Sequence, residues 1–470
     1  MQHSRILPFV LLCGLLLNGC SLMRTRYRRP LANVPQTYAH VDESVKASLD
    51  RWWESFNDSR LSALVAEALK SNNDLALAAL NVRAAQLQVH LAVINPVVAA
   101  DYTYDYSKPL NGSVPATPFH SLTASASYEV DLWDQLGAVK DVARWEAHAT
   151  EQDRQSAVLA LIGTAVNLYY QLADLNYRID LSDQSVAYAT RTLQLVQVLR
   201  SEGGATQLEV AESEQVLESQ KAIHSTLQEQ RVEFRNALTV LLNGTPWPEQ
   251  FERPTVPDGA PRLVAPGLPV SLLDRRPDLR AAELRLRETL AQTDATRLSF
   301  YPNLSLTGSL GTASTGLSEL VSNPLGSLAA IISLPFIQMN QAKFATELAR
   351  TQYEKAEVGF RKTLLQALSD VDNALSARSQ LEAEGTSLER SLAAAKTVER
   401  LEEIRYRAGS VALQVWLDAQ ETRRQAEIAV AGNRLSRIQN FVTLCQVLGG
   451  APLMNDPVEV SAFSPGKPAL

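Results

Sequence analysis

Residues 121–132, SLTASASYEVDL, alternate apolar and polar side chains along their whole length. Side chains of a β-strand point alternately to its two faces, so this period of two predicts a strand with one apolar and one polar face. NLSLTGSL, residues 303–310, repeats the pattern, and DYTYDY, residues 101–106, alternates tyrosine with polar residues. A further segment, residues 328–334, alternates poorly. We therefore expect four strands, near residues 97–106, 121–132, 302–311 and 328–335.

These strands fit two environments. Two-faced hairpins commonly cover a soluble core. The segments also have about the 9 to 11 residues with which a tilted strand spans a bilayer, and Glu129 and Asp131 lie on the polar face, as a water-filled lumen permits. Four strands do not close a barrel, because spanning barrels use at least about eight, and an open edge in lipid leaves backbone groups unpaired. Membrane strands therefore require several copies of the chain.

Prolines divide the rest of the chain. The sequence has 22 prolines, with none in residues 119–245 or 336–451 and eight in residues 246–277. Because proline breaks a helix interior, the two proline-free tracts predict two long helical hairpins joined by a proline-rich connector. Apolar residues three and four apart in both tracts predict coiled-coil seams, for example Leu364, Leu368, Val371 and Leu375. The predicted fold class is mainly α, with a membrane β-barrel portion.

The chain also repeats itself. NDLALAALNVR, which starts at Asn73, matches PDLRAAELRLR at Pro277, an offset of 204, and LNGTP (residues 242–246) matches LGGAP (residues 448–452), an offset of 206. The segment that ends at Gly204 matches the one that ends at Gly409, an offset of 205. We expect an internal duplication. The expected organisation is a signal peptide (1–19), a tether (20–50), repeat 1 (51–245), a connector (246–277), repeat 2 (278–452) and a tail (453–470).

The N-terminus predicts export. Residues 6–17 are an apolar stretch preceded by Arg5, too short for a spanning helix and suited to a secretory signal. Leu17-Asn18-Gly19-Cys20 resembles a bacterial lipobox, which implies lipidation of Cys20, and Ser21 favours sorting to the outer membrane. The alternative is an ordinary signal peptide with an incidental cysteine. The chain has three cysteines, too few for a disulfide framework once the signal is removed and Cys20 is acylated.

Charge and motifs exclude several function classes. The formal net charge is −7 and becomes −8 without the signal, whose only charged residue is Arg5, which argues against nucleic acid as a partner. Arginines at positions 24, 26, 28 and 29 either meet anionic headgroups or belong to a solvated tether. The six histidines lack metal-ligand spacing, and the sequence has no P-loop. We expect no enzyme, no cofactor and no metal site.

Several motifs resemble the TolC-like outer-membrane efflux factors, in particular their lipidated OprM/NodT branch. They are LLDRRPDLRAAE (residues 272–283), YPNLSL (residues 301–306), NDLALA (residues 73–78), and Trp53, Phe56 and Asp58. The resemblance implies a homotrimer whose chains contribute four strands each to a twelve-stranded barrel above an α-helical periplasmic tunnel. It also implies a passive exit duct for small molecules in a Gram-negative outer membrane, anchored by palmitate, with a periplasmic adaptor and an inner-membrane pump, usually of the resistance-nodulation-division class.

Two glycines mark the expected hairpin ends. Gly204 and Gly409 lie where each long helix is expected to reverse, and a glycine there is at least a helix C-cap. The resemblance implies that these turns form the tip that meets the adaptor, and that Tyr406 helps to hold the tip shut. The family often has an arginine two residues after the second glycine, where this chain has Val411.

Asp418 is the main pore candidate. The resemblance matches it to the aspartate that lines the closed periplasmic aperture of the family. Gln414, one helical turn earlier, shares its face and is the second candidate. The alternative for both is an ordinary solvated helix face.

Two rival functions stay open. An outer-membrane component of type I protein secretion would share these features. A lipid-anchored coiled-coil tether without a pore would need the helices but not the strands.

Overall fold

The computed structural model describes residues 23–30, 35–38, 51–108, 117–258, 269–320, 322 and 324–450. The predicted signal peptide (1–19), Cys20 and the tail (453–470) lie outside the described residues. In chain order the elements are η2 (Trp52–Phe56), α2 (Ser59–Ser71), α3 (Asn73–Leu91), β1 (Val97–Ser107), β2 (Thr117–Val130), α4 (Gln135–Ser201), α5 (Gln207–Leu241), η3 (Glu249–Phe251), η4 (Pro269–Ser271), α6 (Leu272–Arg275), α7 (Pro277–Leu298), β3 (Asn303–Ser314), η5 (Leu317–Glu319), β4 (Pro324–Ser333), η6 (Pro335–Ile337), α8 (Met339–Arg407) and α9 (Leu413–Val447).

The chain folds into two compact units, each built from both halves of the sequence. Unit 1 comprises Met1–Ala32, Leu80–Gln152 and Ala281–Thr363, and it contains the sheet. Unit 2 comprises Asn33–Ala79, Asp153–Arg280 and Leu364–Leu470, and it contains α5 and α9. The predicted fold class is confirmed: the protein is mainly helical, with one four-stranded sheet.

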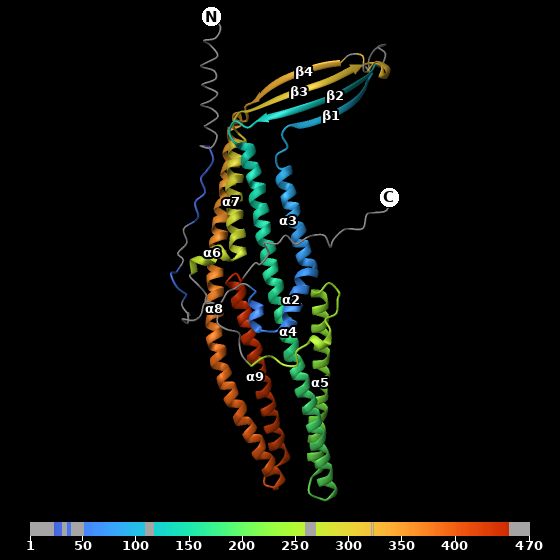
Figure 1. The fold of residues 1–470 in the computed structure, drawn as a ribbon, viewed down its shortest axis with the longest axis vertical. Helices are drawn as coiled ribbons and strands as arrows, with labels where there is room; N and C mark the ends of the chain where they lie inside the picture. Colours follow the sequence, from blue (N-terminus) through green and yellow to red (C-terminus); the bar gives the residue numbers. More distant parts are fainter. Residues whose placement is uncertain are drawn as a thin grey trace. The chain divides into compact units, whose positions relative to one another are not determined.

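The four strands form an antiparallel sheet in the order β1-β2-β3-β4 (Figure 1). β2 ends at Val130 rather than at the expected residue 132. The reason lies in Asp131, whose carboxylate accepts hydrogen bonds from the backbone N–H groups of Gln135 (2.7 Å) and Gly137 (3.0 Å) and so caps the start of α4. β4 runs from Pro324 to Ser333, and Pro335 opens a 3-10 turn directly afterwards.

Two helical hairpins make up much of unit 2. The C-terminal part of α4 returns through α5, and that of α8 through α9 (Figure 1). α5 and α9 have 35 residues each, and their first and last residues differ by 206 positions, so the duplication extends to the element bounds. α4 contains one stretch apolar and long enough to cross a membrane, but 61% of that stretch is buried inside the protein, as in a core helix.

The motif RRPDLRAAE holds the start of α7 in unit 2. The Arg276 guanidinium donates to both carboxylate oxygens of Asp278 (3.0 and 2.7 Å) and lies 3.5 Å from Asp370 on α8. It also donates to the carbonyl of Val447 at the end of α9. Burial acts to lower the pKa of Arg276, but the hydrogen bonds and charges of Asp278 and Asp370 together outweigh it and leave the pKa raised. One arginine thus ties three helices together.

Candidate functional site: the two-faced sheet and the hairpin turns

The strand register separates two chemically different faces. Directly opposed residues of an antiparallel pair project to the same face. Between β2 and β3, Tyr128 opposes Leu306 and Ala124 opposes Leu310, whereas Ser127 opposes Thr307. The register extends the apolar face through β1 and β4 with Val98, Ala100, Tyr102, Tyr104, Leu122, Leu304, Leu328, Ala330 and Ile332. It extends the polar face with Asp101, Thr103, Ser121, Thr123, Ser125, Glu129, Ser305, Ser309 and Ser327.

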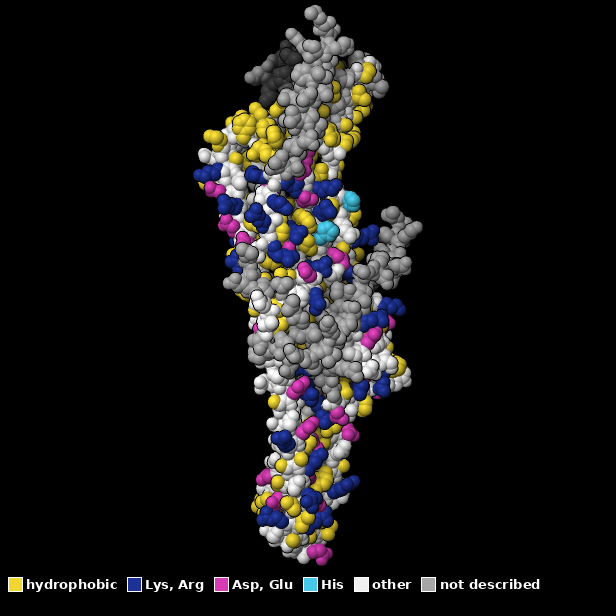
Figure 2. Space-filling model, turned by 60° about the vertical axis from the view of Figure 1, so that its left-hand side comes forward, with side chains coloured by type: hydrophobic (Ala, Val, Ile, Leu, Met, Phe, Trp, Pro, Cys, Tyr) yellow, Lys and Arg dark blue, Asp and Glu magenta, His cyan; other side chains and the backbone are white. Residues whose placement is uncertain are grey.

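The apolar face is uncovered. Leu310, Leu328 and Ile332 are 72%, 87% and 66% exposed. Hydrophobic side chains gather over the sheet in Figure 2, whereas the helical surface shown there mixes charges of both signs. A contiguous apolar surface of this kind marks a lipid or protein contact. The expectation of hairpins that cover a soluble core therefore does not fit this sheet.

Aromatic side chains mark both ends of the sheet. Toward one end the Tyr104 ring lies 4.9 Å from the ring of His120, whose Nδ1 also forms a 2.8 Å hydrogen bond with the hydroxyl of Tyr102 in the middle of β1. At the other end the rings of Trp133 and Tyr301 lie 5.5 Å apart. Aromatic bands above and below an apolar belt are typical of strands that cross an outer membrane.

The sheet has two open edges. β1 pairs only with β2 and β4 only with β3 among the described strands. Every residue of β1 and β4 is exposed. Their outer edges carry backbone donors and acceptors that are available to a further strand, which matters most in lipid, where water does not satisfy them.

Each hairpin turns through a Schellman motif. Gly203 and Gly409 adopt left-handed backbone with φ +77° and +74°. After the first, the N–H of Gly204 donates to the carbonyl of Leu199 at 2.7 Å. The residue that reverses the first helix is therefore Gly203 and not Gly204, which is the next residue of the motif. This correction also changes the repeat offset at the turns from 205 to 206, the value seen at the ends of α5 and α9.

The two turns pack together through a hydrophobic cluster, which we call the tip cluster. Its buried members are Val196, Val210, Tyr406, Leu413, Trp416 and Leu417, drawn from α4, α5, α8 and α9. Tyr406 stacks on Trp416 with ring centroids 5.4 Å apart, and Tyr188 of α4 contacts the same indole edge-on at 6.1 Å. Burial raises the pKa of Tyr406, and Glu209 adds to the effect. The sequence analysis missed Trp416, although its position three residues after Leu413 puts it on the same apolar face of a helix.

Gln414 and Asp418 lie together on the exposed side of α9. The Gln414 side-chain amide donates to the Asp418 carboxylate at 2.7 Å, and both side chains are exposed. Val411 contributes an apolar side chain to the tip cluster. The structure thus brings Gln414 and Asp418 together and leaves both accessible.

Comparison with known proteins decides the family. The model of the outer membrane efflux protein family matches residues 64–244 and again residues 268–450, once for each repeat. The chain belongs to this family. Like its relatives, it is an outer-membrane exit duct of a Gram-negative efflux system. The predicted TolC-like resemblance is confirmed at the level of the family.

Relatives of this efflux family match over nearly the whole chain. A probable efflux pump outer membrane protein of Pseudomonas putida, TtgC, is 30% identical over 93% of this chain and 93% of its own length. The toxin and drug export protein A of Aggregatibacter actinomycetemcomitans is 28% identical over 90% of this chain and 93% of its own. The open-state crystal structure of the Neisseria gonorrhoeae MtrE outer membrane channel aligns with a TM-score of 0.76 and 28% identity over 91% of this chain and 98% of its own.

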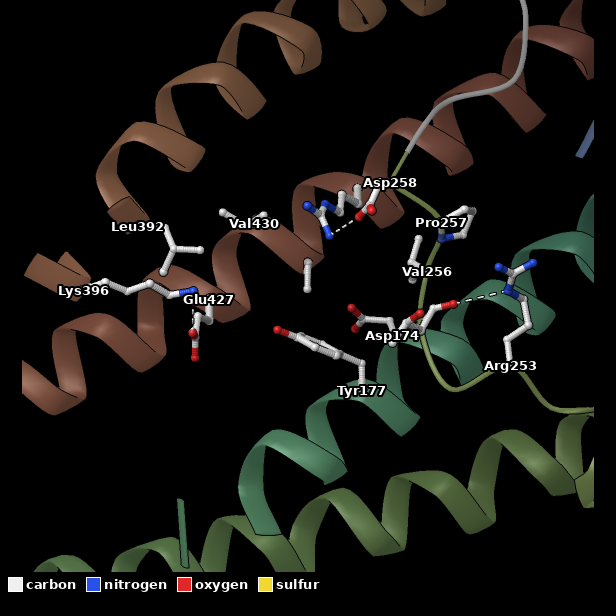
Figure 3. Close-up of a pocket in the computed structure, with 13 residues that line it drawn as sticks. Asp174, Tyr177, Arg253, Val256, Pro257, Asp258, Leu392, Lys396, Glu427 and Val430 are labelled. Atoms are coloured by element: carbon white, nitrogen blue, oxygen red, sulfur yellow. Dashed lines mark hydrogen bonds and ion pairs between the residues drawn. The ribbon is translucent and has the colours of Figure 1, made fainter. Parts of the chain in front are cut away.

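One cavity of this efflux protein has a charged lining. It measures about 570 Å³ and lies in unit 2 between α4, α8, α9 and residues 253–258 (Figure 3). Most of its charges are paired: Lys396 with Glu427 at 3.3 Å and Arg434 with Asp258 at 2.5 Å. Asp174 is buried, which raises its pKa. Within the part of the chain that is described, no cluster of His, Cys, Asp or Glu is placed to hold a metal.

Proposed function

We propose that three copies of this chain close one barrel of twelve strands, four from each copy, and that solutes leave through its lumen. The observation that carries the proposal is the sheet with two open edges and two unlike faces. Closure with neighbouring copies pairs the edge backbone, directs the apolar face to lipid and lines the lumen with hydroxyl and carboxylate side chains.

Charges placed on the two faces test this proposal. Leu306→Arg puts a cation on the apolar face and should cost about 2–4 kcal/mol near mid-bilayer. Ser305→Arg, the adjacent control, puts the same cation on the polar face, directly opposite Glu129. We expect the yield of heat-resistant trimers to fall for Leu306→Arg and to stay near the parent for Ser305→Arg. Equal yields for the two variants would contradict the proposal that the strands span the membrane.

Lipidation of Cys20 is the second part of the proposal. The lipobox-like LNGC sequence supports cleavage before Cys20 and acylation, with palmitate on the terminal amine. Mass spectrometry of the mature N-terminal peptide should find acylated Cys20. Cys20→Ser should abolish the acyl mass and leave an uncleaved precursor. A mature chain that starts elsewhere would refute the lipobox.

The partners are the third part. We propose a passive duct for drugs and other toxic small molecules that receives them from an inner-membrane pump of the resistance-nodulation-division class through a periplasmic adaptor. The turns at Gly204 and Gly409 are the proposed adaptor contacts, since both are exposed. Single cysteines at Glu202 and Ser410 should cross-link to the adaptor, and a cysteine at Val240, exposed near the other end of α5, serves as a comparison. Cys445 is fully buried and does not compete for the reagent.

The aperture is the fourth part. We propose that three copies of the Asp418–Gln414 pair surround the closed periplasmic opening, and that Tyr406, stacked on Trp416, helps to hold it shut. Converging carboxylates concentrate negative potential and attract cations. Asp418→Ala should weaken block by divalent or trivalent cations from the periplasmic side in planar-bilayer recordings. Glu421→Gln, which removes a charge one turn further along α9, is the control. Unchanged block with intact trimers would make Asp418 an ordinary solvated residue.

A further inference from the structure

Residues 23–30, here called the strap, follow the proposed acylation site and, within unit 1, dock on α7 and the start of α4. Arg24 bridges two carboxylates near the start of α4: its guanidinium lies 2.8 Å from Asp134 and 2.5 Å from Asp141. Its side chain is only 20% exposed. A basic residue held between two acids does not behave as part of a solvated tether, and it is not available to lipid headgroups.

The middle of the strap docks on α7. The backbone N–H and the hydroxyl of Thr25 both donate to the Asp294 carboxylate, each at 2.7 Å. Arg29 lies 2.7 Å from Glu283, and the hydroxyl of Tyr27 donates to the same carboxylate at 3.3 Å. The strap therefore uses its backbone, hydroxyl and guanidinium groups together.

The two acids on α7 are buried, and each is bonded both by the strap and by an arginine of α7, Arg297 for Asp294 and Arg287 for Glu283. Asp294 is 2% exposed and Glu283 is 6% exposed. Burial acts to raise the pKa of Glu283, but hydrogen bonds from Arg29 and Arg287 outweigh it and leave the pKa below its usual value. Loss of the strap would take hydrogen bonds away from two buried carboxylates, which is destabilising, so α7 and the strap belong to one folded structure. Glu283 is the last residue of RRPDLRAAE, which gives the end of this motif a structural role.

The first residues of the strap lie near the end of the sheet where β2 ends and β3 begins. Asp134 lies four residues after the end of β2, and Arg297, whose guanidinium donates to the carbonyl of Met23, lies six residues before the start of β3. Met23 is three residues from Cys20, a reach of about 10 Å in a fully extended chain. We propose that the strap is a clamp that fixes the lipid anchor at the end of the sheet where β2 ends and β3 begins. This inference rests on the proposed acylation of Cys20.

Local backbone geometry is shaped around the clamp. Asp134 has left-handed backbone with φ +60°, a conformation that an aspartate tolerates better than most residues. Its carboxylate folds over Gly137, where an added Cβ would lie 1.8 Å from Asp134 Oδ1. Gly137→Ala therefore pushes the Asp134 carboxylate away from Arg24, whose Nη1 would lie 3.4 Å from the new Cβ, at ordinary contact distance.

A spin label on the strap tests the clamp. Met23→Cys supplies the only reactive thiol in the acylated protein, because Cys445 is buried. The label is read in the full-length protein in nanodiscs, alone and with Arg24→Gln or Gly137→Ala. Arg26→Gln is the matched control, since Arg26 lies two residues away on the exposed side of the strap. We expect severalfold faster label motion and a broader range of immersion depths for Arg24→Gln and Gly137→Ala, and parent-like spectra for Arg26→Gln.

The outcomes are distinguishable. Equal label motion in Arg24→Gln and Arg26→Gln, or a label that is already mobile in the parent, would overturn the clamp. Mass spectrometry of the same samples reads acylation separately. An immobile label with an unacylated Cys20 would refute the anchoring role together with the proposed acylation, while it would leave the docking of the strap intact.

Discussion

The two hairpin turns reverse their helices in the same way but begin the return helix by different means. Both use a glycine at φ near +75° and a Schellman motif. In the first turn Thr206 caps α5: its hydroxyl accepts from the N–H of Glu209, whose carboxylate accepts from the N–H of Thr206 at 2.7 Å. In the second turn Ala412 begins α9 with no side-chain cap.

The second turn replaces the cap with packing. Leu413 and Trp416, both in the first two turns of α9, are 0% and 2% exposed. At the offset of 206 their counterparts in α5 are Gln207, which is exposed, and the smaller Val210, which is buried. The comparison indicates which requirement the two copies share. A left-handed residue is needed in both, because backbone sterics leave no alternative, whereas the start of the return helix is stabilised either locally or by tertiary contacts.

Trp416→Ala should have the largest effect on this comparison. Truncation of a buried tryptophan costs about 3–5 kcal/mol, and it removes ring contacts with both Tyr406 and Tyr188. We expect a clear loss of unfolding free energy in guanidinium, followed by circular dichroism. Trp416→Phe is the matched variant. The buried indole N–H of Trp416 finds no hydrogen-bond partner in the described part of the chain. Trp416→Phe should therefore lose far less unfolding free energy than Trp416→Ala. Equal losses would mean that the tip cluster does not depend on the ring.

Alanine at the turning glycines should have the next largest effect. Gly203 and Gly409 have open space where a Cβ would lie, so the cost of Gly203→Ala or Gly409→Ala is the left-handed backbone alone, about 1–2 kcal/mol. Gly204→Ala, at a residue without positive φ, should cost clearly less. The same unfolding measurement ranks the three variants. A larger loss at Gly204 than at Gly203 would contradict the corrected position of the turn.

Local patterns predicted much of this fold. The strand faces followed from a period of two at residues such as Tyr128 and Leu306, and the hairpins followed from the proline-free tracts. β4 was harder, because Ile331 and Ile332 give both of its faces an apolar residue, which breaks the alternation. The position of the first turn needed the hydrogen-bond pattern, since either residue of the Gly203-Gly204 pair fits the sequence.

Contacts between distant residues were not predictable from one sequence. Trp416 meets Tyr188 across more than 200 residues, and Arg24 meets Asp134 across 110. No local period reports either contact. At the candidate aperture, helical spacing placed Gln414 and Asp418 on one face, and the structure adds their hydrogen bond. The role of that pair in an aperture stays a prediction.

Removing the cap of α5 and adding one to α9 should change the unfolding free energy least, and it compares the two turns most directly. Thr206→Ala removes the capping box and should cost about 1 kcal/mol, because the N–H of Glu209 loses its acceptor. Ala412→Ser supplies a hydroxyl at a residue whose backbone already has cap geometry, φ −68° and ψ 154°, and should gain a few tenths to about 1 kcal/mol. In the Trp416→Ala background the gain from Ala412→Ser should be larger, because the local cap then replaces lost packing. Guanidinium unfolding of the four proteins of this cycle measures the coupling. Strict additivity would show that the two ways of starting a return helix do not substitute for each other.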